Sequence, residues 1–478
     1  MTTSIAQRLV RSGSLSGADH VMQNSLIESD RDHLIHPVVS WSQHEQRGVT
    51  VLESGSGAYL RDMEGNVLLD GFAGLWCVNV GYGHETIVRA AAEQMTRLPY
   101  ATGYFHFGSE PAIRLAQQLA ELAPGDLNHV FFTLGGSDAV DSAMRFIRYY
   151  HNVMGRPEKK HVIALDKGYH GSTSTGAGIT GLAAFHKNFD VPLGIQHHIP
   201  APYPYRAPDS SPDAVIAASV AALAEKVGEL GAENVAAFFC EAVQGSGGVI
   251  VPPKGWFAAM RNACREMDIL FVADEVITGF GRTGPLFACE HENVVPDFMT
   301  VAKGLTSGYS PMGAVLMSTR IYRAIADKTA PGDVVGHGFT YSGHPVSAAV
   351  GLEVLRLYLE GGILQNGQKV GAYFEKRLAA MADHPLVGDV RSKGLLAGVE
   401  LVASKRTKAK FAPELGLSGL LARTGYQNKL IFRAFGDGTV GFAPPLCVSR
   451  EDVDLLLERF RKTLDDVLAV KEVCNAID

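Results

Sequence analysis

The chain has 478 residues, of which 46% are hydrophobic and 19% are charged. This composition is typical of a globular α/β protein with more than one core, and it excludes a disordered or fibrous chain. The formal net charge of −7 argues against a general role at nucleic acids or membrane surfaces. The first thirty residues lack a signal-peptide pattern, and no apolar run approaches the roughly 18 residues of a membrane span. We therefore expect a cytoplasmic protein.

The cysteines and histidines carry no recognisable site motif. The six cysteines show neither a CxxC pair nor the spacing of a disulfide framework, which is typical of thiols in a reducing compartment. The 17 histidines include no HExxH motif, so the sequence predicts no metal site.

The N-terminal part begins with a short hairpin, and the middle of the chain repeats a strand, a turn and a helix. Residues 57–62 and 65–70 flank Met63-Glu64 and form the hairpin. Between about residues 75 and 336 the repeat indicates βαβ units of a mostly parallel sheet. The apolar runs expected to be its strands are 129–133, 161–165, 235–240, 269–273 and 298–302.

The C-terminal part is dominated by helical spacing of apolar residues, at 345–359 and 453–470. Before it, the Pro- and Ser-rich residues 200–212 are expected to form a surface loop leading into a helix at 214–227. We predict an α/β protein in which residues 76–338 form a large domain. Residues 1–75 and 339–478 are expected to join in a smaller α/β domain.

Two apolar strand-like runs end on a charged residue. The run Ile269 to Ala273 leads into Asp274, and the run Phe298 to Ala302 leads into Lys303. Open α/β sheets bind ligands beyond the carboxyl ends of their strands, so both charges are expected to meet at one crevice. A lysine there can be a covalent amine nucleophile, and an aspartate there can neutralise a protonated pyridine ring.

Three further segments have more than one interpretation. Gly135-Gly136-Ser137 precedes a predicted helix and is either a phosphate-binding turn or an ordinary helix cap. Tyr169 follows a strand and can stack on a flat heterocycle or simply pack at a turn. The stretch 279–284 matches GxGxxG, but it does not directly follow a strand, and Pro285 follows its last glycine. A nicotinamide site is therefore disfavoured there.

The chain carries a phosphate turn, an aromatic residue after a strand, Asp274 and Lys303, in this order. With this combination it resembles a known family. It is similar to the class III branch of fold-type I pyridoxal-phosphate aminotransferases, the ω-aminotransferases. The stretches that carry the resemblance are 70–79, 131–142, 168–171, 241–248, 271–284, 300–313, 338–345 and 443–446.

The resemblance implies a fold-type I enzyme and a role for each cofactor residue. Lys303 would hold the cofactor covalently and transfer the proton, a task that needs a neutral amine. Asp274 would pair with the pyridine nitrogen. The remaining cofactor contacts would come from Gly136 and Ser137 at the phosphate, Val276 and Tyr169 at the two ring faces, Glu241, and Thr340 of a second subunit. The active site would then be shared within a homodimer, and whether dimers pair into tetramers is left open.

Two positions narrow the substrate. The stretch 241–246 ends on Ser246, where ornithine- and 4-aminobutyrate-type relatives carry a glutamate that restrains an arginine. Arg433 resembles the mobile arginine of pyruvate-dependent members, which would clamp a carboxylate and swing away for an uncharged amine. Trp76, Tyr104 and Phe105 would form the walls of the substrate pocket.

The resemblance predicts transfer of an amino group from an ω-amino acid or primary amine to pyruvate. The donor would resemble β-alanine, a polyamine or an arylalkylamine, and the products would be an aldehyde or ketone and L-alanine. An aminomutase, decarboxylase or racemase would use the same Lys303 and Asp274, so these remain alternatives. A non-catalytic binding module is a more remote one.

Overall fold

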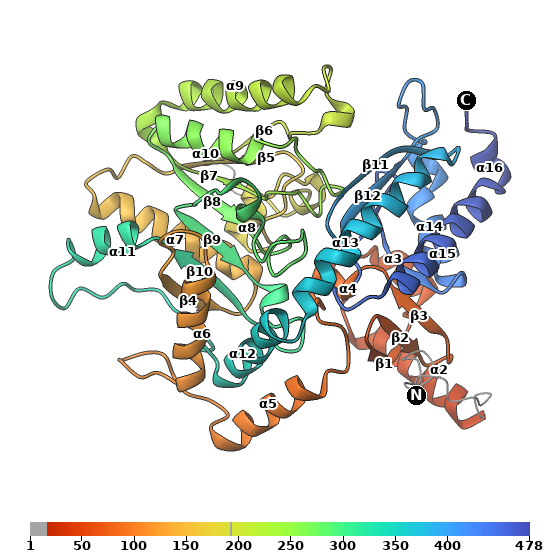
Figure 1. The fold of residues 1–478 in the computed structure, drawn as a ribbon, viewed down its shortest axis with the longest axis horizontal. Coiled ribbons are helices and arrows are strands. Elements are labelled where there is room, and N and C mark those ends of the chain that lie inside the picture. Colours follow the sequence, from red (N-terminus) through yellow and green to blue (C-terminus); the bar gives the residue numbers. More distant parts are fainter. Residues whose placement is uncertain (1–16, 192–193) are drawn as a thin grey trace.

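The computed structural model describes residues 17–191 and 194–478, which form three sheets with helices around them (Figure 1). The first sixteen residues of the segment predicted to belong to the small domain lie outside this part. In the described part, no helix combines the length and the apolar character needed to cross a membrane.

A seven-stranded sheet forms the centre of the large domain, in the order β4-β10-β9-β8-β7-β5-β6. From β6 to β9 neighbouring strands run parallel, whereas β10 is antiparallel to both β9 and β4. The strands are β4 (His129–Thr133), β5 (His161–Leu165), β6 (Gln196–Ile199), β7 (Val235–Cys240), β8 (Leu270–Asp274), β9 (Phe298–Val301) and β10 (Gly313–Met317). The predicted mostly parallel sheet and its five predicted strands are confirmed.

Helices cover both faces of this sheet, which explains why its strands are continuous apolar runs. Successive side chains of a strand point to opposite faces. Thus Phe238 joins the core formed with Trp256 of α10 (Trp256–Glu266), whereas Phe239 joins the core formed with Met144 of α7 (Gly136–Val153). All of these side chains are buried.

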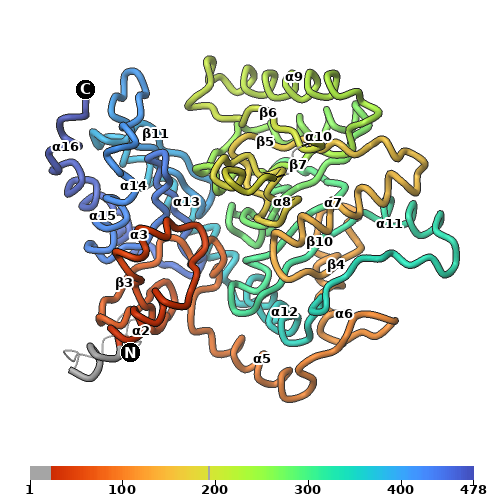
Figure 2. Tube along the Cα trace, turned by 180° about the vertical axis from the view of Figure 1, so that it is seen from behind, coloured from red at the N-terminus to blue at the C-terminus, as the bar shows by residue number. Residues whose placement is uncertain are grey.

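Segments from both ends of the chain build the smaller lobe, where red and blue elements lie side by side in Figures 1 and 2. One sheet has the order β1-β2-β3-β13, and Leu430 of β13 pairs in parallel with Leu69 of β3. The other sheet has the order β11-β12-β15-β14. The strands are β1 (Leu52–Ser56), β2 (Tyr59–Asp62), β3 (Val67–Asp70), β11 (Val387–Lys393), β12 (Leu396–Leu401), β13 (Leu430–Ile431), β14 (Arg433–Ala434) and β15 (Thr439–Phe442).

The predicted hairpin is present as β2 and β3, and the union of the two ends in one lobe is confirmed. The domain boundaries drawn at residues 75 and 338 stay predictions.

The predicted C-terminal helices are also present. Pro345 opens α12 (Pro345–Leu359), which packs on α5 and α6, and a capping box of Ser449 and Asp452 starts α15 (Arg450–Leu468). The other helices are α2 (Gly17–His33), α3 (Trp41–Arg47), α4 (Ala73–Trp76), α5 (Glu85–Arg97), α6 (Glu110–Leu122), α8 (Ser174–Ile179), α9 (Pro212–Leu230), α11 (Thr319–Ala326), α13 (Ile363–Ala379), α14 (Leu417–Gln427) and α16 (Lys471–Cys474).

The segment 200–212 is more than the surface loop that its composition predicts. It contains a short 3-10 helix (Pro204–Arg206), and Tyr203 is buried. The Tyr203 hydroxyl donates a hydrogen bond to Glu400 of β12, and Arg206 Nε donates to the same carboxylate at 2.9 Å. This loop therefore links the large sheet to the smaller lobe, which local composition could not indicate.

Candidate active site

Lys303 and Asp274 lie at the carboxyl ends of neighbouring parallel strands. Asp274 is the last residue of β8 and pairs with Thr300 of β9, and Lys303 is the second residue after the end of β9. Lys303 has a φ of 43°, in the left-handed region that non-glycine residues rarely adopt. Such strain concentrates at functional sites. The two predicted catalytic residues are thus brought to one edge of the sheet.

The environment of Lys303 favours a neutral amine. Burial lowers the pKa of Lys303, and the nearby Asp274, Cys77 and Glu241 only partly oppose this effect. Its Nζ lies 5.4 Å from the centre of the Trp76 ring. An amine that loses its proton at a lower pH than an ordinary lysine can act as a nucleophile and as a base.

Asp274 is held by a histidine that sequence reasoning missed. Nδ1 of His170 lies 2.8 Å from Asp274 Oδ2, and the backbone N–H of Val276 donates to Asp274 Oδ1 at 3.1 Å. Burial acts to lower the pKa of His170, but Asp274 and Glu241 together raise it above its ordinary value. Each carboxylate oxygen has a further lone pair, so Asp274 can still accept a ring N–H.

The signal for His170 was present in the sequence. This histidine follows the end of β5, and β5, β7 and β8 are neighbours in the sheet. Because carboxyl ends of parallel strands meet at one edge, a histidine in the loop after β5 was a candidate partner for Asp274.

The start of α7 has the form of an anion cradle. Gly135 precedes this 18-residue helix and provides no side-chain cap, and the N–H groups of Gly136 and Ser137 have no hydrogen-bond partner among the described residues. Ser137 Oγ accepts a hydrogen bond from the backbone N–H of Ser172 at 3.2 Å. A Cβ on Gly136 would lie 2.9 Å from Val276 Cγ1, so only glycine allows the helix start to approach Val276 this closely.

Glu241 ties together the loops that follow β5 and β7. Its Oε1 accepts from the backbone N–H of Tyr169 at 3.1 Å, and its Oε2 accepts from that of Gly245 at 2.8 Å. The Tyr169 hydroxyl lies 3.0 Å from Ser172 Oγ, next to the α7 cradle. Glu241 thereby fixes Tyr169 beside the predicted phosphate turn.

Trp76 belongs to an aromatic wall that continues to Arg433. The Trp76 ring contacts Phe72 edge-on at 4.4 Å and stacks with Phe435 at 6.3 Å between ring centres. The guanidinium of Arg433 lies 5.5 Å from the centre of the Phe435 ring. Phe435 therefore connects two of the predicted substrate residues, and no sequence motif singled it out.

Arg433 is half-buried, and its guanidinium makes no hydrogen bond or ion pair with any residue in 17–191 or 194–478. Burial lowers its pKa. The half-buried Ser246, at the position where related enzymes carry a glutamate, forms no ion pair with it. An unpaired, partly desolvated guanidinium is suited to a carboxylate that arrives from outside.

Within one chain, three of the predicted site residues lie outside the aromatic wall: Tyr104, Phe105 and Thr340. Tyr104 is 40% exposed and Phe105 is 82% exposed, and Thr340 is also exposed. The three share one region of the surface, because Tyr100 donates to the Thr340 carbonyl at 3.0 Å and a Cβ on Gly338 would meet the Tyr104 hydroxyl.

The GxGxxG stretch serves the architecture instead. Arg282, within it, is fully buried and donates to the carbonyls of Leu395 and Pro444 and to Asn79. These contacts join the loop after β8 to Asn79 and to the C-terminal part of the smaller lobe.

An α/β fold with a strand-end lysine, a strand-end aspartate and an anion cradle defines a pyridoxal-phosphate-dependent transferase of fold type I. The sequence profile of the class-III aminotransferases matches residues 41–464. The chain belongs to this family, whose members depend on pyridoxal phosphate, and it is therefore an aminotransferase.

Individual relatives agree with this assignment. The chain is 43% identical to a putrescine–pyruvate aminotransferase of Pseudomonas aeruginosa, over 92% of this chain and 95% of that protein. It is 37% identical to a diaminobutyrate–2-oxoglutarate transaminase of Halomonas elongata, over 92% and 96%. A solved (S)-enantioselective ω-transaminase of Thermomicrobium roseum superposes with a TM-score of 0.90 at 40% identity, covering 96% of this chain and 100% of that one.

Proposed function

We propose that this enzyme transfers an amino group from a primary amine or ω-amino acid to pyruvate, giving an aldehyde or ketone and L-alanine. The unpaired guanidinium of Arg433 beside the Trp76 wall is the observation that carries the proposal. The proposal is supported by the name of the Pseudomonas aeruginosa relative, which is that of an enzyme acting on putrescine and pyruvate. An apolar wall suits the body of an amine, and the arginine suits the carboxylate of the acceptor.

The residues present fit pyridoxal phosphate. Lys303 would hold it covalently, Asp274 would accept the hydrogen bond of its ring nitrogen, and the α7 cradle would bind its phosphate. When bound, this group acts as a sink for the electrons left when the donor carbon loses its proton. Tyr169 and Val276 would lie against the two faces of its ring.

The protein would then contribute binding, orientation and proton transfer. Arg433 would hold the carboxylate of pyruvate in a two-pronged hydrogen bond and so orient its keto carbon. With its pKa lowered by burial, Lys303 would take a proton from the donor carbon in the first half-reaction and deliver a proton to the acceptor carbon in the second. The His170 contact would keep the Asp274 carboxylate aimed at the ring nitrogen.

We further propose a homodimer that shares its active sites. Exposed apolar side chains cluster in the sequence around 100–107 and 334–341, and such patches mark association surfaces. They are Tyr100, Tyr104, Phe105, Phe107, Val334, Val335 and Tyr341. A second copy of the chain would cover them and bring Thr340 to the phosphate of its neighbour. We also propose a cytoplasmic location, which the six free cysteines favour.

The test is donor screening with pyruvate while L-alanine is measured. Putrescine-like diamines, β-alanine and arylalkylamines are offered singly to the holoenzyme, and we expect alanine to form together with a change in cofactor absorbance. An aminomutase, decarboxylase or racemase would form no alanine. Failure of every donor to change the absorbance would refute the proposal.

A further inference from the structure

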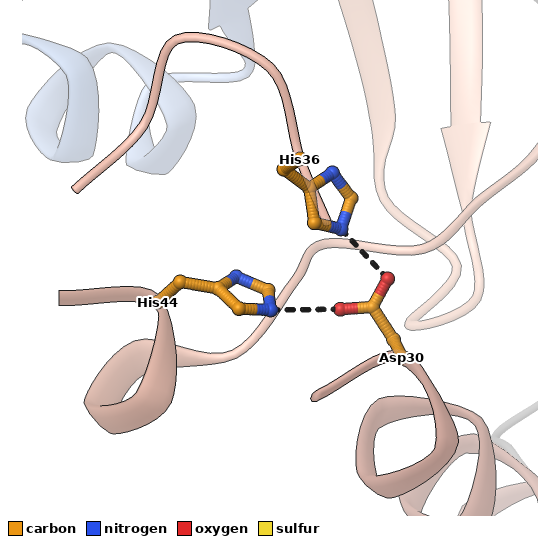
Figure 3. A group of neighbouring side chains, drawn as sticks. All are labelled: Asp30, His36 and His44. Atoms are coloured by element: carbon orange, nitrogen blue, oxygen red, sulfur yellow. Dashed lines mark hydrogen bonds and ion pairs between the residues drawn. The ribbon is translucent and has the colours of Figure 1, made fainter. Parts of the chain in front are cut away.

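Two histidines and an aspartate converge on one point in the N-terminal segment, away from the cofactor residues (Figure 3). Asp30 comes from α2, His36 from the turn after α2, and His44 from α3. Their candidate ligand atoms all lie within 4.8 Å of one another. Both imidazoles direct Nε2 at the same carboxylate, as the dashed lines in Figure 3 show.

The contacts within this cluster are unequal. His36 Nε2 lies 2.7 Å from Asp30 Oδ1 in a hydrogen bond. His44 Nε2 lies 3.1 Å from Asp30 Oδ2, yet both of these atoms are shielded from solvent and have no hydrogen-bond partner among the described residues. The two atoms thus face each other without forming a well-directed hydrogen bond, and both are atoms that can ligate one cation.

We propose that Asp30, His36 and His44 bind a divalent transition-metal ion, with Zn²⁺ as the expected occupant. Two imidazole nitrogens and one carboxylate oxygen form a ligand set that zinc accepts, with a fourth position left for water. Magnesium and calcium prefer sets made of oxygen alone, so they are not expected here. The side chains are 25% (His36), 13% (His44) and 11% (Asp30) exposed, which leaves a path for the ion.

The site would have a structural role, because its ligands come from three successive segments. Pro37 and Val38, directly after His36, wall a cavity of about 440 Å³ together with Ser172 and Phe185. Ser172 donates its backbone N–H to Ser137 of the α7 cradle. An ion that joins α2, this turn and α3 would therefore fix one wall of the cavity that adjoins the cradle.

No sequence motif indicates this site, and the sequence predicts no metal. Zinc motifs place ligands at short fixed spacings on one turn or one helix face. Here the third ligand is supplied by a separate helix, so the cluster exists only after α3 has folded back on α2.

The experiment measures metal binding by the tag-free holoenzyme after chelator treatment. Zn²⁺ affinity is obtained by competition with a chromophoric chelator, and Co²⁺ is used as a spectroscopic substitute. We expect one ion per chain and a Co²⁺ absorption typical of low coordination with nitrogen ligands. Asp30→Asn and His44→Gln should each weaken Zn²⁺ binding at least about tenfold, since even residues outside the ligand shell cost 10–100-fold.

His197→Gln is the matched control. His161 and His197 form another close imidazole pair, at 2.8 Å, so this variant tests for adventitious binding by neighbouring histidines. Its zinc affinity and stoichiometry should equal those of the unchanged protein. Circular dichroism and cofactor absorbance verify that each variant is folded.

The proposal would be overturned if the unchanged protein showed no saturable Zn²⁺ binding. It would also be overturned if Asp30→Asn and His44→Gln bound Zn²⁺ with the same affinity as the unchanged protein. If either variant fails to fold, the Co²⁺ spectrum of the unchanged protein decides. The spectrum of hydrated octahedral Co²⁺ would then count against the site. None of these measurements depends on which amine the enzyme uses.

Discussion

Arg433 is the residue on which substrate choice is expected to depend. It is a partly buried cation without a protein partner in the described ranges, and Phe435 lies between it and Trp76. Leaving a guanidinium unpaired and partly desolvated costs free energy, and a carboxylate ligand would recover that cost.

Replacement of Arg433 by alanine should impair pyruvate far more than an amine that lacks a carboxylate. Charge-assisted hydrogen bonds contribute about 1.5–3 kcal/mol, so kcat/KM for pyruvate should fall about 10- to 100-fold. The half-reaction with an arylalkylamine, followed by cofactor absorbance under single-turnover conditions, should change by less than about twofold. Arg423→Ala, at an exposed position on α14, is the control. Equal losses for both substrates would contradict a carboxylate clamp.

At the residue scale, the sequence predicted the location of a residue when a single strand determines it. It did not predict contacts that depend on how two or more strands are arranged. Asp274 and Lys303 each end an apolar run, so their location at the sheet edge followed from local pattern. The contact between His170 and Asp274 depends on β5 and β8 both flanking β7, an order that no single segment encodes.

Among the elements, α7 and the loop after β8 are fitted to each other through Gly136. Adding a Cβ there would bring it within 2.9 Å of Val276, one of the residues predicted to cover the cofactor ring. The helix start and Val276 cannot both keep their positions once this space is filled.

Gly136→Ala should therefore weaken binding of pyridoxal phosphate, by about 5- to 150-fold if the crowding costs the roughly 1–3 kcal/mol typical of overpacking. Fluorescence titration of the cofactor-free protein measures the effect. Gly228→Ala is the matched control, because a Cβ at this position in α9 meets nothing within 4 Å. The control should bind the cofactor normally and gain slightly in helix stability. Unchanged affinity in Gly136→Ala would show that the cradle tolerates a side chain.

The Glu241 carboxyl joins the loops after β5 and β7, and its protonation makes the stability of the folded protein depend on pH. Burial raises its pKa to about 7, with Asp274 adding to the shift and His170 opposing it. The folded protein thus keeps this proton up to about pH 7, whereas the unfolded chain releases it near the ordinary value of 4.5. Across this window the folded state binds more protons, so its stability falls as pH rises.

Glu241→Gln should reduce that loss of stability between about pH 5 and about pH 8. Urea unfolding of the cofactor-free protein at both pH values measures it. The variant also lacks one of two carboxylate acceptors and should be less stable throughout, by about 1–3 kcal/mol. Glu225→Gln, at an exposed position on α9, should leave the pH dependence unchanged. The same pH dependence in Glu241→Gln as in the unchanged protein would contradict this assignment.

At the scale of the whole molecule, the exposed Tyr104, Phe105 and Thr340 distinguish a site built by one chain from a site built by two. Sequence reasoning placed Tyr104 and Phe105 in the pocket wall, but in one chain they lie on the surface. A single sequence does not specify which copy a residue serves, because the chain would be the same in both subunits of the proposed dimer.

A mixed dimer of Lys303→Ala and Thr340→Val chains tests the shared site. If Thr340 serves the neighbouring subunit, one of the two sites in the mixed dimer contains both native residues, and activity should be about half that of the native dimer. The measurement is alanine formation by dimers purified through two different tags. If Thr340 serves its own subunit, the mixed dimer would instead have about half the activity of the Thr340→Val homodimer.

The parallel pairing of β3 with β13 has a consequence for how the protein is made. The hairpin is synthesised long before its partner Leu430, because the central sheet lies between them in the chain. The seven strands of the central sheet all lie between His129 and Met317 and can associate in the meantime. Until Leu430 has been synthesised, the hairpin presents an unpaired strand edge. The edge of β3 is therefore open to misassociation while the central sheet is being made.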